Sequence, residues 1–123
     1  MKIICVTKVE GLTVGKQYEV MKIGPREDGK HQWKMGYFVI NDNNVLKRYE
    51  KAPMGIINVL EVTDIFLEYV GKEYKGLTYG KAYQMLRNKI DDYNYFLNDD
   101  NEFVGIRKVN YLGGKPLFKE VVN

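Results

Sequence analysis

The sequence predicts an all-β protein made of two small barrels in tandem, and three observations lead to this prediction. First, Gly11–Val20 (GLTVGKQYEV) returns as Gly76–Met85 (GLTYGKAYQM), with Gly, Leu, Thr, Gly, Lys and Tyr at the same spacing. Second, an Asn/Asp-rich turn follows each copy, at 41–44 and at 98–101. Third, no segment keeps the apolar period of a helix over three turns, whereas short apolar runs alternate with turn residues. Two copies are too few for a solenoid, so we expect two domains, 1–62 and 63–123.

The first unit is expected to contain five strands. Gly15 lies in a tight turn at 12–16, where a positive φ is needed. Asn and Asp tolerate the left-handed conformation, so residues 41–44 predict a hairpin turn. The segment 51–55 is a connector. The five expected strands cover residues 2–7, 17–23, 37–40, 45–49 and 56–62.

The second unit repeats this plan. We expect a loop at 71–75 before the repeated motif, a polar turn at 88–94 and a Gly-rich loop at 110–118. Its expected strands cover residues 65–70, 84–87, 95–97 and 103–107, with a final edge strand at 119–122.

Five short strands in about 55 residues, joined by Gly-containing turns, are typical of a small, partly open barrel of the SH3 or OB type. The short, hairpin-like connections favour the SH3-like alternative. Domains of this size bury a small fraction of their surface, so we expect the two barrels to pack on each other.

The units differ most in one loop. Tyr18 and Asn41 are 23 positions apart, whereas Tyr83 and Asn98 are 15 apart, so the first unit has eight extra residues. We place this inserted loop near 24–36 because natural repeats accept insertions in loops. It contains the chain's single Trp and single His.

The motif Leu-Thr-x-Gly-Lys-x-Tyr, preceded by a short strand that ends near Cys5 and followed by an Asn-Asp turn, resembles small SH3-like domains of bacteriophages and prophages of Firmicutes. The resemblance covers 2–49 well and 67–107 less well, because Met85 replaces an aliphatic residue and Val70 falls near the place of Cys5. It implies a phage origin, an SH3-like fold and no enzymatic residues.

Composition narrows the classes of function. The net charge is +3, and all of the excess lies in residues 1–62, which argues against a dedicated duplex-DNA binder. A single cysteine excludes an internal disulfide and suits a reducing compartment. No apolar run or leader pattern indicates a membrane span or secretion. We therefore expect a cytoplasmic protein, in the host cell if phage-encoded.

The sequence predicts a non-enzyme that needs no cofactor and no metal. Gly11–Lys16 is not a phosphate-binding P-loop, because it has three residues between the glycines and no Ser or Thr after the lysine. We expect it to be a turn that leads into a strand, with Lys16 and its twin Lys81 solvated. Cys5 and His31 are the only candidates for a nucleophile and a base, and Cys5 lies in an apolar strand. The Asn/Asp turns lack the Gly and Glu of a calcium loop, so they too are expected to be structural.

Aromatic residues indicate a binding function. Ten Tyr and five Phe exceed what two small cores can bury, and exposed aromatics are typical of protein interfaces. The candidate partner-binding residues combine the inserted loop with nearby tyrosines: Arg26, Lys30, His31, Trp33, Lys34, Tyr37 and Tyr49.

The first functional hypothesis is an accessory protein that binds a host protein, such as a defence component, and inhibits or redirects it. The second is a single-stranded nucleic-acid binder that stacks bases on aromatic rings. A third is a protein that sequesters a small molecule or nucleotide.

Overall fold

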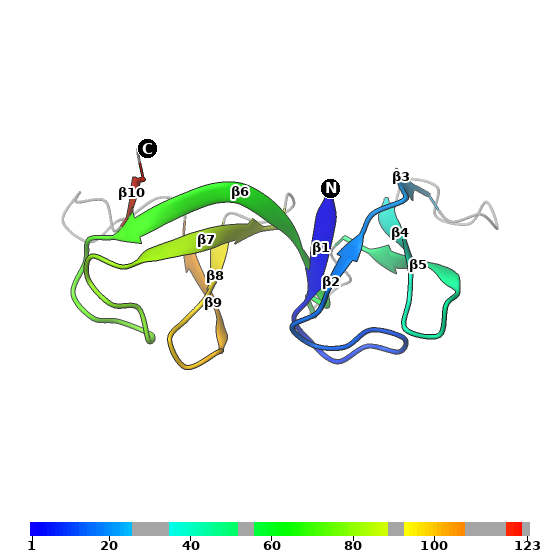
Figure 1. Cartoon of the computed structure of the whole chain (residues 1–123), viewed down its shortest axis with the longest axis horizontal. Coiled ribbons are helices and arrows are strands. Elements are labelled where there is room, and N and C mark those ends of the chain that lie inside the picture. The colour runs from blue at the N-terminus through cyan, green and yellow to red at the C-terminus, as the bar shows by residue number, and fades with distance from the viewer. Residues whose placement is uncertain (26–34, 52–55, 89–92, 108–117, 122–123) are drawn as a thin grey trace. The chain divides into compact units, whose positions relative to one another are not determined.

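The computed structural model describes residues 1–25, 35–51, 56–88, 93–107 and 118–121. Within these residues the chain is all β and has no helix, which confirms the predicted fold class (Figure 1). The strands are β1 (Lys2–Cys5), β2 (Gln17–Glu19), β3 (Lys22–Gly24), β4 (Gly36–Ile40), β5 (Leu46–Glu50), β6 (Val59–Tyr69), β7 (Ala82–Arg87), β8 (Tyr93–Leu97), β9 (Phe103–Arg107) and β10 (Phe118–Glu120).

The described strands form two sheets. One has seven strands in the order β2-β1-β6-β7-β8-β9, with β10 also paired to β6, and the other has the order β3-β4-β5. Neither sheet closes on itself in the described part of the chain. The sheets therefore support an all-β architecture, and the closed barrels stay a prediction.

Strand β6 belongs to both units of the chain. The units are Met1–Val62 with Asn88–Ile90, and Thr63–Arg87 with Asp91–Asn123, so the division after Val62 falls inside β6. The sequence predicted two strands here, at 56–62 and 65–70, but the structure has one. Thr63 continues the extended backbone and its hydroxyl donates to the Met85 carbonyl at 2.6 Å. A β-branched residue bonded in this way favours continuation of a strand.

The two halves of β6 have different partners. Residues 59–62 pair antiparallel with β1, where Val59 lies opposite Cys5. Residues 67–69 pair antiparallel with β10, where Tyr69 lies opposite Phe118. The predicted edge strand at 119–122 is thus observed one residue earlier, at 118–120. The predicted loops at 88–94 and 110–118 lie mostly outside the described residues.

The predicted strand 17–23 is divided into β2 and β3, which lie in different sheets. Tyr18 in β2 pairs with Ile3, whereas Ile23 in β3 pairs with Tyr37. Between them, the amide of Val20 bonds to the Met1 carbonyl and the next amide, of Met21, bonds to Phe38. Because consecutive amides bond to different strands, the strand passes from one sheet to the other at this point. Its counterpart β7 is continuous.

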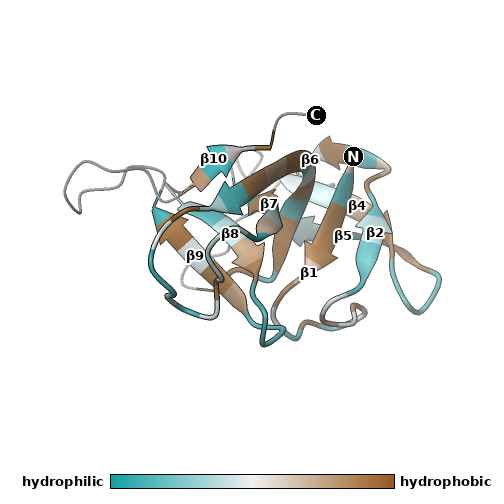
Figure 2. Cartoon of the chain, turned by 60° about the vertical axis from the view of Figure 1, so that its left-hand side comes forward, coloured by the Kyte–Doolittle hydropathy of each residue, from teal (hydrophilic) through white to brown (hydrophobic). Residues whose placement is uncertain are grey.

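Each unit has its own apolar core. Ile3 and Tyr18 contribute to the first, and Phe96 and Tyr83 to the second. Apolar residues are concentrated in the strands, and β1 is mostly brown in Figure 2. Buried members of the first core are Ile3, Cys5, Leu12, Tyr18, Tyr37, Val39, Tyr49 and Val59. Buried members of the second are Tyr69, Leu77, Tyr83, Met85, Phe96 and Ile106.

The place of Cys5 is taken by Tyr69 in the second unit, one residue before the Val70 suggested by the sequence. The carbonyl of Cys5 accepts the Gly15 amide at 2.7 Å, and the carbonyl of Tyr69 accepts the Gly80 amide at the same distance. Cys5 is fully buried, as predicted for an inert thiol, and burial raises its pKa.

Candidate functional site

The repeated motif forms a tight turn that leads into a strand, as the sequence predicts. The amide of Lys16 bonds to the Thr13 carbonyl at 3.0 Å, and Gly15 has a φ of 87°. A positive φ at the third position of a turn is the geometry of a type II turn, and it favours glycine. The residue before the glycine, Val14, has an exposed side chain.

Asp42, from the hairpin between β4 and β5, gathers three side chains of this turn around its carboxylate. Thr13 donates its hydroxyl to Oδ2 at 2.7 Å, and Lys16 bonds to Oδ1 at 2.9 Å. Tyr18 donates its hydroxyl to Oδ1 at 2.8 Å while accepting the Thr13 amide, also at 2.8 Å. The turn and the hairpin are therefore held together by one carboxylate.

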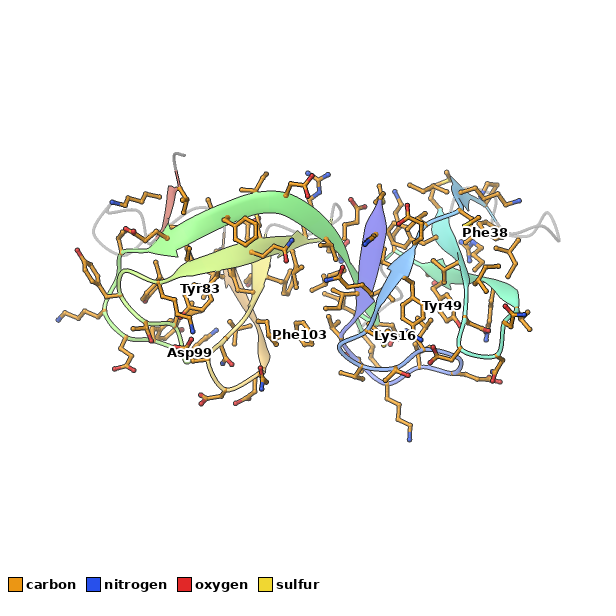
Figure 3. All side chains as sticks on the ribbon, viewed as in Figure 1. Lys16, Phe38, Tyr49, Tyr83, Asp99 and Phe103 are labelled. Atoms are coloured by element: carbon orange, nitrogen blue, oxygen red, sulfur yellow. The ribbon has the colours of Figure 1, made fainter. Side chains whose placement is uncertain are left out.

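Asp99 makes the same cluster in the second unit. Thr78 donates to Oδ2 at 2.5 Å, Tyr83 donates to Oδ1 at 3.1 Å, and Lys81 also bonds to Oδ1. Tyr83 accepts the Thr78 amide at 2.8 Å. Figure 3 shows Tyr83 and Asp99 close together beside this turn. We call the two arrangements the aspartate clusters.

In each aspartate cluster the lysine of the motif forms an ion pair with the aspartate. Lys16 and the two hydroxyl groups lower the pKa of Asp42 to about 2, with the lysine as the largest cause. Lys81 in the same way lowers the pKa of Asp99. The carboxylates in turn raise the pKa of each lysine. The lysines are more than half exposed, but each forms an ion pair, so the expectation that both are simply solvated is corrected.

A buried asparagine shapes each hairpin next to its aspartate. The side-chain oxygen of Asn41 accepts the amides of Asn43 and Val45, at 3.0 and 3.1 Å. Asn98 accepts the amides of Asp100 and Glu102 in the same positions. Asparagine thus acts as a backbone mimic inside the turn, which confirms the structural interpretation of these turns.

Each hairpin also contacts a glycine of the preceding loop. The amide of Asp42 bonds to the Gly11 carbonyl at 2.8 Å, and that of Asp99 to Gly76 at 3.0 Å. The two glycines have φ values of 85° and 75°. A Cβ at either position would lie 2.6 Å from the side-chain amide nitrogen of the adjoining asparagine. Glycine is therefore required both by the backbone angle and by the space.

The fixed loops display different side chains in the two units. At the position of Val14 the second unit has Tyr79, whose side chain is 71% exposed. At the position of Val9 it has Tyr74, which is 51% exposed, with the Lys75 ammonium 5.2 Å from its ring centroid. We call residues 70–81 the tyrosine loop. It presents two aromatic side chains on a backbone that Asp99 holds in place.

Two of the seven predicted partner-binding residues lie in the described part of the chain. Tyr37 and Tyr49 are core residues, 1% and 5% exposed, and so cannot present rings to a partner. Their position on the inward side of β4 and β5 explains the correction, because the two residues pair directly across these strands. The other predicted residues, Arg26, Lys30, His31, Trp33 and Lys34, lie outside the described part of the chain.

The buried hydroxyl groups of these tyrosines have polar partners. Tyr37 donates to the Glu61 carboxylate at 2.5 Å, and Glu61 is itself 1% exposed. Tyr49 donates to the Glu10 carbonyl at 2.9 Å. Buried hydroxyl groups of this kind serve packing and specificity of the core.

Within the described residues no three His, Cys, Asp or Glu side chains gather in a metal-binding cluster. The same residues contain no helix long and apolar enough to cross a bilayer. Comparisons of the chain with models of protein families, with curated proteins and with solved structures found no match.

The sequence predicts both turns that form each aspartate cluster, but it does not predict the contact between them. It singled out the Thr-x-Gly-Lys-x-Tyr turn and the Asn-Asp turn as separate repeats. One sequence signal could have predicted this contact. Both copies contain the same Thr, Lys and Tyr in the first turn and the same Asn-Asp pair in the second, so these residues recur together. Positions that recur together in a divergent duplication are candidates for mutual contact.

Proposed function

We propose that the chain is a non-enzymatic accessory protein of the phage type that binds a host protein and inhibits or redirects it. In this proposal it consists of two SH3-like barrels and acts in the host cytoplasm, where a defence component would be a suitable target. The tyrosine loop is the binding element.

The order of the strands supports the SH3-like part of the proposal. In the first unit, β6 pairs with β1 and β1 with β2, and β3, β4 and β5 follow as antiparallel neighbours. In the second unit, the order is β10, β6, β7, β8 and β9. When β2 and β3 are counted as one interrupted strand, each unit has its last strand beside its first, a long loop after the first strand and a hairpin between its third and fourth, as expected of a small SH3-like barrel.

One observation carries the functional part: Tyr74 and Tyr79 are exposed on a loop whose backbone is fixed. Tyrosine offers a large contact area with few rotatable bonds, and it is enriched where binding energy is concentrated. A loop that is already ordered loses less conformational entropy on binding than a flexible one. Asp99 provides that order through Thr78 and Lys81.

The test compares two variants of the tagged full chain in lysate of a Firmicute host. In the first, Tyr74→Ser and Tyr79→Ser remove both rings of the tyrosine loop. The matched control is Val14→Ser, which changes the equivalent exposed position of the first unit. We expect one stoichiometric partner with wild type and with the control. We expect capture to fall at least about tenfold with the double variant, since each anchor contributes about 1 kcal/mol or more.

A photo-crosslinking amino acid at position 79, with position 14 as the control site, identifies the contact directly. Crosslinks to that partner are expected from position 79 alone. Absence of a stoichiometric partner, or equal capture by the double variant, would contradict the proposal. The predicted contribution of the inserted loop is measured in the same assay with Arg26→Ala and Trp33→Ala.

A further inference from the structure

Strand β9 lies at the edge of its sheet. Among the described residues, β9 pairs with β8 and with no other strand. The amide of Asn98 bonds to the Glu102 carbonyl, so residue 102 turns its carbonyl towards β8. Because backbone groups alternate in direction along an antiparallel strand, Phe103 and Gly105 turn their N–H and C=O groups away from β8. Within the described chain, no hydrogen bond is made to these outward groups.

The composition of β9 does not protect this edge. Natural proteins block an edge strand with a charged side chain, a proline or a bulge. Between Phe103 and Ile106 the strand has no charged residue and no proline, and its pairing with β8 is continuous. Gly105 has no side chain beside the outward groups, and glycine in a strand often marks the close approach of another backbone. This edge can therefore accept a further strand.

The equivalent edge of the first unit is protected by charge. Strand β5 is an edge strand of the three-stranded sheet, and it has Lys47 and Arg48 at the positions of Val104 and Gly105. Lys47 is exposed. If two copies of β5 paired antiparallel, like charges would face each other across the pair, which is destabilising. The edge of β5 therefore serves as an internal control for the edge of β9.

We propose that β9 pairs antiparallel with β9 of a second copy of the chain and so forms a two-fold symmetric dimer. The axis passes beside Val104, which places Phe103 of each copy opposite Gly105 of the other. Each such pair exchanges both of its N–H···O=C bonds, so every outward backbone group of these two residues is satisfied. The two copies of Val104 face each other, and β-branched side chains favour such cross-strand pairs.

Charge complementarity identifies the added strand as a second copy of β9. Acidic residues occur just before the strand, at positions 100 and 102, and basic residues occur at its end, at positions 107 and 108. In the antiparallel arrangement, the acidic end of each strand lies beside the basic end of the other. This attraction depends on the sign of the charge at each end, so Arg107 keeps its contacts with the Tyr93 ring and hydroxyl. A parallel arrangement would bring like charges together, so the charges also fix the direction of the added strand.

The dimer should be weak because the shared edge is short. Strand β9 has five residues, and an edge of this length buries less than the roughly 1,600 Å² of a standard interface. We therefore expect a dissociation constant of about 10–100 μM. The pairing uses none of the residues of the tyrosine loop, so it can fail or succeed independently of the proposed function.

Sedimentation velocity of the full chain over about 5–500 μM tests the association, a range chosen to bracket the expected dissociation constant. Wild type should change from the 14.4 kDa monomer to a species of twice that mass. Phe103→Pro removes an outward N–H but no bond to β8, and symmetry removes this bond from the dimer twice. It should therefore weaken association at least about tenfold. The matched control is Leu46→Pro, which makes the same change at the equivalent position of β5 and should associate like wild type.

An exchange of charges tests the antiparallel direction. Asp100→Lys with Glu102→Lys makes both ends of the strand basic, and Arg107→Gln with Lys108→Glu makes both ends acidic. Each variant alone should associate more weakly than wild type, because like charges then meet at both ends. An equimolar mixture of the two should form a mixed dimer, since each basic end meets an acidic one. Recovery in the mixture also shows that both variants are folded at this edge.

Amide hydrogen exchange, followed by NMR, locates the interface without any variant. The amides of Phe103 and Gly105 should exchange more slowly in the concentrated sample than in the dilute one, whereas the outward amide of Leu46 should not change. A chain that stays monomeric at about 500 μM, growth beyond a dimer, equal association by Phe103→Pro, or no mixed dimer would each overturn the proposal. Slower exchange confined to other strands would also overturn it, in favour of a different interface.

Discussion

The two aspartate clusters have the same hydrogen bonds, but the exposed residues on their loops differ. Asp42 and Asp99 bind a Thr, a Lys and a Tyr in the same way, although the exposed residue of the turn is Val14 in one loop and Tyr79 in the other. The recurring residues bond to the carboxylate, have a positive φ, shape the hairpin as Asn41 and Asn98 do, or lie in the core as Leu12 and Leu77 do. Positions that only display a side chain have diverged. The difference separates residues that hold the loop in shape from residues whose side chains are only exposed on it.

The two units also differ in how the hairpin asparagine is hydrogen-bonded to the loop that contains Gly11 or Gly76. In the second unit the Asn98 side chain donates directly to the Lys75 carbonyl at 2.9 Å. In the first, Asn41 donates to the Tyr49 hydroxyl at 3.4 Å, and Tyr49 donates to the equivalent carbonyl, that of Glu10. The first unit thus inserts a buried tyrosine between the asparagine and this carbonyl, and we call it the tyrosine relay.

The largest expected loss of stability comes from substitution of the glycine whose carbonyl bonds to the aspartate amide, which is Gly11 in the first unit and Gly76 in the second. Gly76→Ala should lower the free energy of unfolding by about 2–3 kcal/mol. A positive φ costs about 1–2 kcal/mol for alanine, and displacement of the Asn98 amide loses a hydrogen bond worth about 1 kcal/mol. Chemical denaturation measures the change. Gly80→Ala is the control, because its φ is also positive but no atom lies within 4 Å of the new Cβ, so it should cost about 1–2 kcal/mol. Equal losses would contradict the role of the close contact.

Removal of the tyrosine relay should affect the first unit alone. Tyr49→Phe should cost about 1–2 kcal/mol, because the Asn41 amide and the Glu10 carbonyl both lose this hydroxyl group. Tyr79→Phe is the matched control and should be neutral, since that side chain is largely exposed. Thermal unfolding of both variants decides the point, and an equal loss in both would argue against the relay.

The aspartate clusters should make stability depend on pH in the acid range. The pKa of Asp42 is about 2 in the folded chain and 3.8 ordinarily, so protons favour the unfolded chain as the pH falls. The stabilisation is present above about pH 5 and is lost as the pH falls through 3.8 towards 2. Asp42→Asn with Asp99→Asn should flatten the fall in melting temperature between pH 5 and pH 2. An unchanged slope in the double variant would refute this linkage.

The smallest effect should follow from an exchange of the displayed residues. Val14→Tyr and Tyr79→Val change side chains that point into solvent, so each should alter stability by no more than about 0.5 kcal/mol. Calorimetry measures this directly. A loss above about 1 kcal/mol in either variant would mean that the displayed side chain belongs to the fold.

Much of the fold could be predicted from local patterns. The Asn-Asp turns, the glycine turns and the strands at 36–40, 46–50 and 103–107 lie at or within one residue of the predicted positions. Turn chemistry and alternation act over a few residues, and these elements depend on little else. Of the seven predicted site residues, Tyr37 and Tyr49 are buried, because alternation along a strand does not reveal which of its faces packs on the core. The other five lie outside the described residues and stay predictions.

Local patterns are enough to establish that the chain is all β, that one unit is present twice and that turns fall at Gly15, Gly80 and the Asn-Asp pairs. They do not show that β6 runs through the division between the units, or that Asp42 contacts Thr13 and Lys16. Backbone propensity is set by neighbours in sequence, whereas a contact across 26–29 positions depends on which strands pair and which face each side chain takes.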